Sequence, residues 1–170
     1  MFFALWPDAS VRERIAKAAA GLRLSGGARP VPPENYHLTL AFVGEVPSAS
    51  LAVLQQIGRT QRQPGCTISL DTYEHWPESR VVAAVARQTP AAMNGLSTRL
   101  RDAAQVPRQE PLRAHVTLAR KVAQAPVLQA MSPIEWSVRA FSLVNSDTRG
   151  SHAVYTVVDS WPLLDETPTP

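Results

Sequence analysis

The sequence predicts an α+β fold, with two pseudo-symmetric lobes of antiparallel sheet flanked by helices. Strand-like apolar patterns outnumber helical ones along the chain. The last two strand-like segments are separated by a turn, which indicates a hairpin and therefore antiparallel pairing. A nine-residue pattern occurs once in each half of the sequence, as expected of two similar lobes.

The chain opens with strand and helix patterns in alternation. An apolar segment over residues 1–6 predicts a buried strand that ends at Pro7. Asp8 or Ser10 can cap a helix, because apolar side chains recur at helical spacing over residues 11–22.

A stiff, proline-rich loop over residues 25–33 leads into a second strand over 36–43. Ser48 can cap a second helix, which carries apolar side chains at 51, 54 and 57. Residues 66–72 alternate in polarity, which predicts a strand with one apolar face.

The later elements follow from the same patterns. A continuous apolar run over residues 81–85 predicts a central strand that is buried on both faces. Beyond it we expect a helix over 90–105, a strand over 114–119, an irregular connection over 122–133, and a hairpin of strands 134–144 and 152–161 with its turn at 147–150.

The composition limits the class of protein. Of the 170 residues, 45% are hydrophobic, so the chain can bury a core and is not disordered. Lys and Arg number 17 against 14 Asp and Glu, a balance that suits an anionic substrate but not a non-specific nucleic-acid coat. The single cysteine, Cys66, excludes an internal disulfide, and no apolar stretch is long enough for a signal peptide or a membrane span. We expect one two-lobed domain over 1–165, a frayed tail over 166–170, and a cytoplasmic monomer without membrane contact.

Two of the four histidines, His37 and His115, begin nearly identical segments. Each stands in the pattern Pro-x-x-x-His-x-Thr-Leu-Ala, and the His-x-Thr-Leu cores are residues 37–40 and 115–118. In a strand, residues two apart share a face, so each histidine projects together with the threonine that follows it, Thr39 or Thr117. If the two strands lie side by side, one cleft holds two imidazoles and two hydroxyls.

This set of side chains suits in-line substitution at phosphorus. One group must take a proton from the nucleophile, and another must give a proton to the leaving oxygen on the opposite side. Histidine titrates near neutral pH, so two histidines can hold opposite protonation states. The threonine hydroxyls can donate to the non-bridging oxygens, whose charge grows in the transition state. The reaction needs no metal and no cofactor.

The two segments resemble the signature of the two-histidine phosphoesterase superfamily, and most closely its bacterial branch, the RNA 2′,3′-cyclic phosphodiesterases, also called 2′-5′ RNA ligases. The resemblance extends from residues 31–46 and 115–120 to the opening strand, 2–7, and to 79–82. It implies a two-lobed α+β fold with the active cleft between the lobes.

The resemblance also implies the reaction, which is opening of a 2′,3′-cyclic phosphate to a 2′-phosphomonoester without metal. His37 would be the proton donor to the 3′ oxygen, and His115 the proton acceptor that activates water. Attack by a 5′-hydroxyl in the reverse sense would give 2′-5′ ligation. The expected partners are RNA ends or nucleotides with a 2′,3′-cyclic phosphate.

Two departures from the family pattern concern the shape of the cleft. Ala114 stands where the family often has Pro before the second histidine, and Ala83 or Ala84 stands where it often has a large residue. Neither position belongs to the His-x-Thr cores, so the departures bear on cleft width and base preference more than on the chemistry.

The two segments differ at the fifth residue after each histidine, which is Phe42 in one and Arg120 in the other. In a flat strand this odd offset puts them on the face opposite the histidines, where they would be a core Phe and a surface Arg. A strand end or a bulge would instead turn them toward the cleft. We hypothesise that Arg120 then binds the phosphate and Phe42 packs near a base.

Other aromatic and basic residues are weaker candidates. Tyr36 and Trp76 can stack on bases, although packing is the more frequent role of such residues. Arg29, Arg80 and Arg113 can form a basic rim for flanking phosphates, with a solvated surface as the alternative.

Three alternatives stay open. The same cleft can be a nucleotide-binding or RNA-end-binding module without turnover, or an enzyme for another phosphoester. A zinc site is the third alternative, but it would need ligands beyond the two motif histidines, and His75, His152 and Cys66 show no recognisable ligand spacing. We therefore expect His75 and His152 to be structural or at the surface.

Overall fold

The computed structural model describes residues 1–24, 26–107, 110–147 and 153–164, and its described strands and helices confirm the α+β class. The strands are β1 (Phe2–Leu5), β2 (Arg29–Pro30), β3 (Leu38–Phe42), β4 (Cys66–Leu70), β5 (Thr72–Trp76), β6 (Val81–Val85), β7 (His115–Arg120), β8 (Ile134–Val138), β9 (Ala140–Asp147) and β10 (Val154–Pro162). The helices are α1 (Ala9–Ala20), α2 (Leu51–Thr60) and α3 (Ala91–Ala103), with short 3₁₀ turns η1 (Pro33–Asn35) and η2 (Ser48–Ser50).

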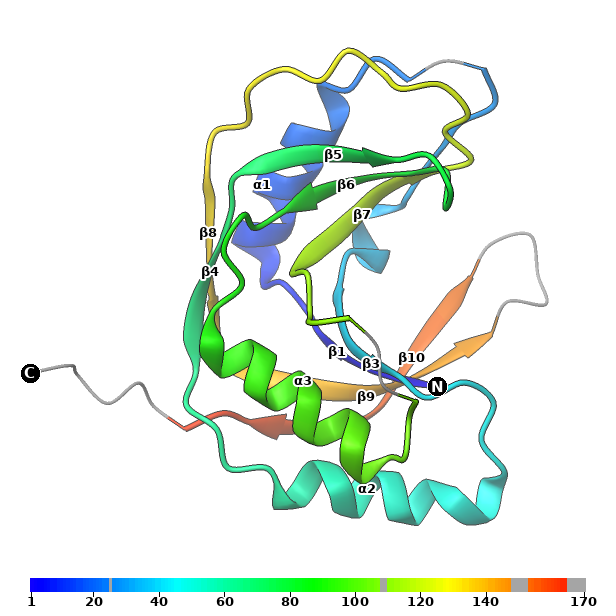
Figure 1. The fold of residues 1–170 in the computed structure, drawn as a ribbon, viewed down its shortest axis with the longest axis vertical. Helices are drawn as coiled ribbons and strands as arrows, with labels where there is room; N and C mark the ends of the chain where they lie inside the picture. Colours follow the sequence, from blue (N-terminus) through cyan, green and yellow to red (C-terminus); the bar gives the residue numbers. More distant parts are fainter. Residues whose placement is uncertain (25, 108–109, 148–152, 165–170) are drawn as a thin grey trace, which may run out of the picture.

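The described strands form two four-stranded sheets and a two-stranded ribbon. One sheet has the order β10-β9-β1-β3, the other the order β2-β7-β6-β5, and β4 pairs with β8. All of these pairs are antiparallel. Helix α1 covers the sheet that contains β7, whereas α2 and α3 lie along the sheet that contains β3, and the β4–β8 ribbon runs down one side (Figure 1). Each sheet thus carries one motif strand and its own helical cover.

Two predicted helix starts have different outcomes. Of the two expected caps of the first helix, Asp8 is the one found. Its side chain accepts a hydrogen bond of 2.9 Å from the backbone N–H of Val11 at the start of α1. The expectation that Ser48 caps the second helix is wrong. Ser48 begins η2, and α2 starts after Ser50 without a side-chain cap, since Pro47 turns the chain into the 3₁₀ geometry first.

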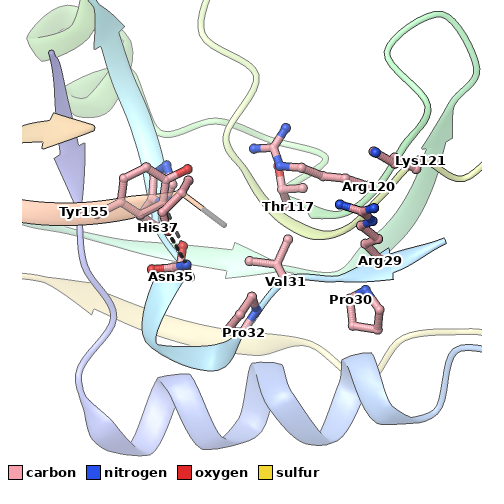
Figure 2. A pocket seen from close by; sticks show the side chains of 11 residues that line it. Arg29, Pro30, Val31, Pro32, Asn35, His37, Thr117, Arg120, Lys121 and Tyr155 are labelled. Carbon is pink, nitrogen blue, oxygen red and sulfur yellow. Dashed lines mark hydrogen bonds between the residues drawn. The ribbon is translucent and has the colours of Figure 1, made fainter. Parts of the chain in front are cut away.

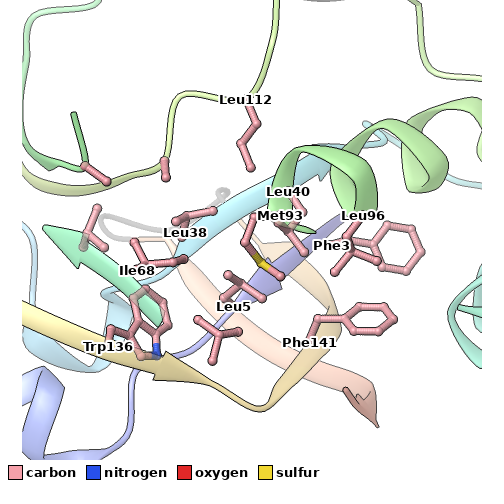
Figure 3. Packing of buried hydrophobic residues seen from close by; sticks show 14 of the residues in the cluster. Phe3, Leu5, Leu38, Leu40, Ile68, Met93, Leu96, Leu112, Trp136 and Phe141 are labelled. Carbon is pink, nitrogen blue, oxygen red and sulfur yellow. The ribbon is translucent and has the colours of Figure 1, made fainter. Parts of the chain in front are cut away.

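The main core lies between the sheets and the helices. Alternate side chains of β1 and β3, namely Phe3, Leu5, Leu38 and Leu40, are fully buried there. They pack with Met93 and Leu96 of α3 and with Ile68, Trp136 and Phe141 (Figure 3). The helical spacing of the apolar residues in α3 and the alternation in β4 are therefore confirmed. Within the described residues, no helix is both long and apolar enough to span a membrane.

The strand predicted over 134–144 is wrong as a single element. It breaks at Arg139 into β8 and β9, which belong to different sheets. Within the main core the apolar side chains change parity at the break: Ile134, Trp136 and Val138 before it, and Phe141 and Leu143 after it, while Val144 is buried in a separate cluster. A straight strand cannot bury both parities against one layer.

The remaining predictions are mostly confirmed. All five residues of β6 are buried in the middle of their sheet, as their apolar run predicts. Strand β5 was not predicted, because Thr72–Trp76 has no alternation and every residue is half-buried. β9 and β10 pair antiparallel, as expected of the hairpin, while the turn predicted at 147–150 lies largely outside the described residues, like the tail 166–170.

Candidate active site

The two motif strands contain the same backbone irregularity. In both, the register to the neighbouring strand shifts directly after the motif threonine, Thr39 in β3 and Thr117 in β7. The leucine that follows, Leu40 or Leu118, is therefore an extra residue, as in a β-bulge. The two halves share backbone geometry as well as sequence.

The bulge changes which face the next side chains occupy. Leu40 and Ala41 are both buried, although neighbours in a regular strand point to opposite faces, and β7 repeats this pattern. Phe42 and Arg120 then emerge on the exposed side, with 59% of Phe42 accessible to solvent. The flat-strand alternative of a core Phe42 is therefore wrong.

The two imidazoles are held in the same way. Nδ1 of His37 lies 2.7 Å from the carbonyl oxygen of Asn35, and Nδ1 of His115 lies 2.7 Å from that of Arg113. A carbonyl oxygen can only accept, so Nδ1 donates in both cases. In the neutral ring, Nε2 then carries the lone pair and is the atom available for proton transfer.

The surroundings of the two rings differ. The His37 ring contacts Phe2, Trp6 and Tyr155, with ring centroids 5.0, 5.3 and 5.0 Å away. The His115 ring has one aromatic neighbour among the described residues, Trp76, at 4.6 Å and edge-on. His37 therefore lies in an aromatic enclosure that has no counterpart at His115.

A charged network lies behind His115 instead. Glu74 accepts from the Trp76 indole N–H at 2.8 Å and forms an ion pair with Arg113. Arg113 also lies over the Trp76 ring, and its backbone carbonyl holds His115. The Glu74 carboxylate therefore contacts both Trp76 and Arg113, two residues that touch the His115 imidazole.

Burial lowers the pKa of both histidines, since removing an imidazolium from water is costly. The positive charge of Arg120 lowers both pKa values further. His115 lowers the pKa of His37, whereas Arg113 lowers and Glu74 raises the pKa of His115. Arg120 thus acts electrostatically on the histidines of both motifs.

Two adjoining cavities meet at His37. One is lined by Thr39, Phe42 and Arg120, and the other by Thr117 and again Arg120 (Figure 2). Both cavities also include Tyr155. The structure therefore gathers five of the six predicted site residues around shared space. The sixth, His115, lines neither cavity and lies beside them against Trp76.

The structure gives different positions to the weaker candidates, which are the aromatic and basic residues and the remaining histidines. Tyr36 is 3% exposed in the core, so its expected alternative role, packing, is the one found. Of the basic rim, Arg29 lines the cavity beside His37, while Arg113 is engaged with Glu74. His75 is half-buried, with Nε2 3.1 Å from the carbonyl oxygen of Val122.

The small side chains of Ala83 and Ala84, where the family often has a large residue, do not line either cavity. Both are fully buried, and Ala83 packs with Val81 and Val85 under Trp76. The tryptophan side chain of β5 thus occupies space beside the small residues of β6.

Three residues in or around the site were not predicted: Tyr155 beside His37, Glu74 behind His115, and Lys121 in the cavity lining. Tyr155 reaches His37 from β10, about 118 residues later in the chain, and no local pattern encodes such a contact. Glu74 lies in the unpredicted strand β5. Lys121 directly follows the second motif. Its backbone φ of +58°, which is unusual for a residue other than glycine, is visible in the structure and not in the sequence.

No group of three or more His, Cys, Asp and Glu side chains in the described ranges has an arrangement that could hold a metal ion. The described lining of the two cavities includes imidazole, hydroxyl, guanidinium and aromatic groups. Two imidazoles held in the same way, of which His37 faces the shared space with the two hydroxyls and a guanidinium, are typical of two-histidine phosphoesterases.

Comparisons with known proteins agree with this class. Residues 5–86 match the family described as LigT like Phosphoesterase. The RNA 2′,3′-cyclic phosphodiesterase of Escherichia coli (strain K12) is 34% identical over 169 residues, which cover 96% of each chain. The chain therefore belongs to the LigT-like phosphoesterase family.

A second relative and a solved structure extend the match. The RNA 2′,3′-cyclic phosphodiesterase of Thermus thermophilus is 30% identical over 98% of this chain and 91% of the relative. The crystal structure of E. coli LigT complexed with 3′-AMP superposes with a TM-score of 0.83 and 34% identity, over 95% of this chain and 96% of that one. The fold and the sequence therefore match over nearly the whole chain.

Proposed function

We propose that the protein is an RNA 2′,3′-cyclic phosphodiesterase, in which His37 is the general acid and His115 the general base. The observation that carries the proposal is the duplicated, bulged His-x-Thr strand, with each Nδ1 held by a backbone carbonyl. The names of the full-length relatives support the same activity.

The proposed reaction is a single in-line displacement. A water oxygen attacks phosphorus while Nε2 of His115 takes its proton. The bond from phosphorus to the 3′ oxygen breaks on the opposite side, and Nε2–H of His37 gives that oxygen a proton. The product is a 2′-phosphomonoester with a free 3′-hydroxyl. Thr39, Thr117 and Arg120 donate to the non-bridging oxygens as their charge grows.

The electrostatics support one protonated and one neutral imidazole. Each imidazolium disfavours a second one nearby, and His115 lowers the pKa of His37. Arg113 lies near His115 and lowers its pKa more than Glu74 raises it, which favours a neutral base. A bound phosphate anion favours protonation of the histidine that faces it, and we assign that role to His37.

Phe42 is proposed to pack against a base at the cleft mouth, since it is exposed and lines the cavity that contains His37 and Thr39. The substrates proposed are RNA ends or nucleotides with a 2′,3′-cyclic phosphate, with 2′-5′ ligation as the reverse reaction. We also propose a monomer that acts in the cytoplasm and requires no metal or other cofactor.

The test is phosphorus NMR of an RNA end with a 2′,3′-cyclic phosphate after incubation with the purified protein. We expect conversion of the cyclic signal to that of a 2′-phosphomonoester, unaffected by EDTA. Binding of the RNA end without any product would favour the non-catalytic module. A 3′-phosphomonoester product would refute the assignment of the leaving oxygen.

A further inference from the structure

The outer end of the cavity beside His37 is strongly positive. Arg29, Arg120 and Lys121 line this cavity, and none of its described lining residues is acidic. The other polar side chains that line it are Asn35, His37, Thr117 and Tyr155. The cavity has a volume of about 170 Å³, so it is a defined concavity rather than a flat basic surface.

The arrangement of these cations is costly for the fold. Arg29 of β2 stands directly opposite Arg120 of β7, and like charges at paired positions destabilise a sheet. Lys121 follows with a backbone φ of +58°, a conformation that costs energy for a residue other than glycine. Within the described residues, none of the three forms an ion pair with a carboxylate. An anionic ligand would offset these costs.

The three cations divide between two positions. The side chain of Arg120 extends toward Thr117, whereas Arg29 and Lys121 line the part of the same cavity that is away from His37 in the view of Figure 2. Neighbouring strands are about 4.8 Å apart, so the backbone of Arg29 lies one strand beyond the motif strand. Arg120 therefore suits the reacting phosphate, and the other two cations suit a second phosphate.

The wall between the two positions is apolar and stiff. It consists of residues 30–32, Pro-Val-Pro, and the backbone N–H of Val31 donates to the carbonyl oxygen of Leu118 at 2.8 Å. Each proline fixes its own φ, so this wall keeps its shape without a ligand. A ribose can lie along it and span the two positions.

We infer that Arg29 and Lys121 form a subsite for the phosphate on the 5′ oxygen of the terminal nucleotide, so the enzyme favours substrates that carry this phosphate over a bare nucleoside 2′,3′-cyclic phosphate. In an RNA chain this group is the phosphodiester to the preceding nucleotide. The inference rests on the proposed function and adds the recognition of the chain upstream of the reacting end.

The test compares three substrates: a nucleoside 2′,3′-cyclic phosphate, the same compound with a 5′-phosphate, and a dinucleotide that ends in the cyclic phosphate. For the unaltered protein we expect kcat/KM to be about tenfold or more higher for the last two, as for a charge-assisted phosphate contact. The double variant Arg29→Gln with Lys121→Gln should lose this advantage through KM and keep its rate on the first substrate. Arg23→Gln, an exposed arginine outside both cavities, is the matched control.

Two further measurements separate the inference from the proposed function. Each removed phosphate contact should reduce the salt dependence of binding by a slope of about one. Calorimetry should show that a nucleoside 2′,5′-bisphosphate binds more tightly than the 2′-monophosphate, and that the double variant removes the difference. If no substrate turns over but this difference is found, the proposed function fails and the subsite stands.

Three results would overturn the subsite. Equal kcat/KM on all three substrates would do so, as would an equal loss in the double variant on the substrate without a 5′-phosphate. A preference for the dinucleotide alone would assign the recognition to the upstream nucleoside instead of the phosphate.

Discussion

The two histidines stand at the starts of matching motif strands, His37 directly before β3 and His115 as the first residue of β7, but in unlike surroundings. His37 is enclosed by aromatic rings, whereas His115 lies against Trp76, which is tied to the Glu74–Arg113 ion pair. The bulged strands themselves are alike. The pseudo-symmetry therefore ends at the motif backbone, and strands outside the repeat supply the difference between the two groups. A reaction that needs one acid and one base requires such a difference.

Replacing each histidine by alanine tests the comparison most severely. On a 2′,3′-cyclic phosphate, either variant should lose about 10²- to 10⁴-fold in kcat, the usual contribution of a general acid or base. An aryl phosphodiester with a nitrophenolate leaving group needs no protonation of that group. On this substrate we expect His37→Ala to be largely spared and His115→Ala to remain impaired, as measured by release of nitrophenolate.

The control for this prediction is a binding measurement. Both variants should bind a nucleoside 2′-phosphate with a similar affinity by calorimetry, which shows that the cleft is intact. If His115→Ala is the spared variant, the acid and base assignments must be exchanged.

Replacing the motif threonines tests whether both halves stabilise the transition state. Thr39→Val and Thr117→Val keep the side-chain shape but remove the hydroxyl donor, and each should lower kcat by up to about 10²- to 10³-fold. Thr39→Ser and Thr117→Ser should restore most of the rate in a steady-state assay. A valine variant that retains kcat would show that its hydroxyl does not contact the phosphate.

The bulges are stabilised differently in the two halves. The carbonyl oxygen of Leu40 accepts from the hydroxyl of Ser97 in α3 at 2.5 Å, whereas that of Leu118 accepts from the backbone of Val31 at 2.8 Å. Ser97→Ala leaves a buried carbonyl without its partner and should cost about 1–3 kcal/mol of unfolding free energy in urea denaturation.

Ser142→Ala is the matched control for Ser97→Ala. Among the described residues Ser142 is the second buried serine, and its hydroxyl pairs with that of the exposed Ser160 at 2.8 Å. Water can replace that contact, so the loss should be smaller, about 0.5–1.5 kcal/mol. Equal losses would mean that the bulge carbonyl gains nothing special from α3.

Local patterns were sufficient for the motif strands. The alternation around His37 placed Leu38 and Leu40 in the core and Thr39 beside the histidine, and the structure has this arrangement. The bulge was only an alternative, because a two-residue period cannot say where a strand gains a residue. The exposed side of Arg120 depends on that extra residue.

The sequence patterns did not predict the contacts between strands that are distant along the chain. Tyr155 reaches His37 only because the β9–β10 hairpin returns beside β1, and Glu74 reaches His115 through the mixed-polarity strand β5. The break at Arg139 did leave a trace, the change in parity of the buried side chains around it. That trace concerns the main core alone, because β9 also buries Ser142 and Val144 on its other face.

The pH profile offers the finest test of the comparison. Glu74 raises the pKa of His115 and does not act on His37. Glu74→Gln keeps an oxygen that can accept from the Trp76 indole but removes the charge, so the pKa of His115 should fall. If His115 is the base, the acidic limb of kcat/KM moves to lower pH while the basic limb, set by His37, stays in place.

Arg120→Gln is the matched variant, because Arg120 lowers the pKa of both histidines. Removing its charge should raise both values, so both limbs should move to higher pH. The limbs report the coupled pair, and only the contrast between the two variants assigns each limb to a residue. Movement of the basic limb alone in Glu74→Gln would mean that His115 is the acid, and the network behind it would then serve the leaving group instead of the water.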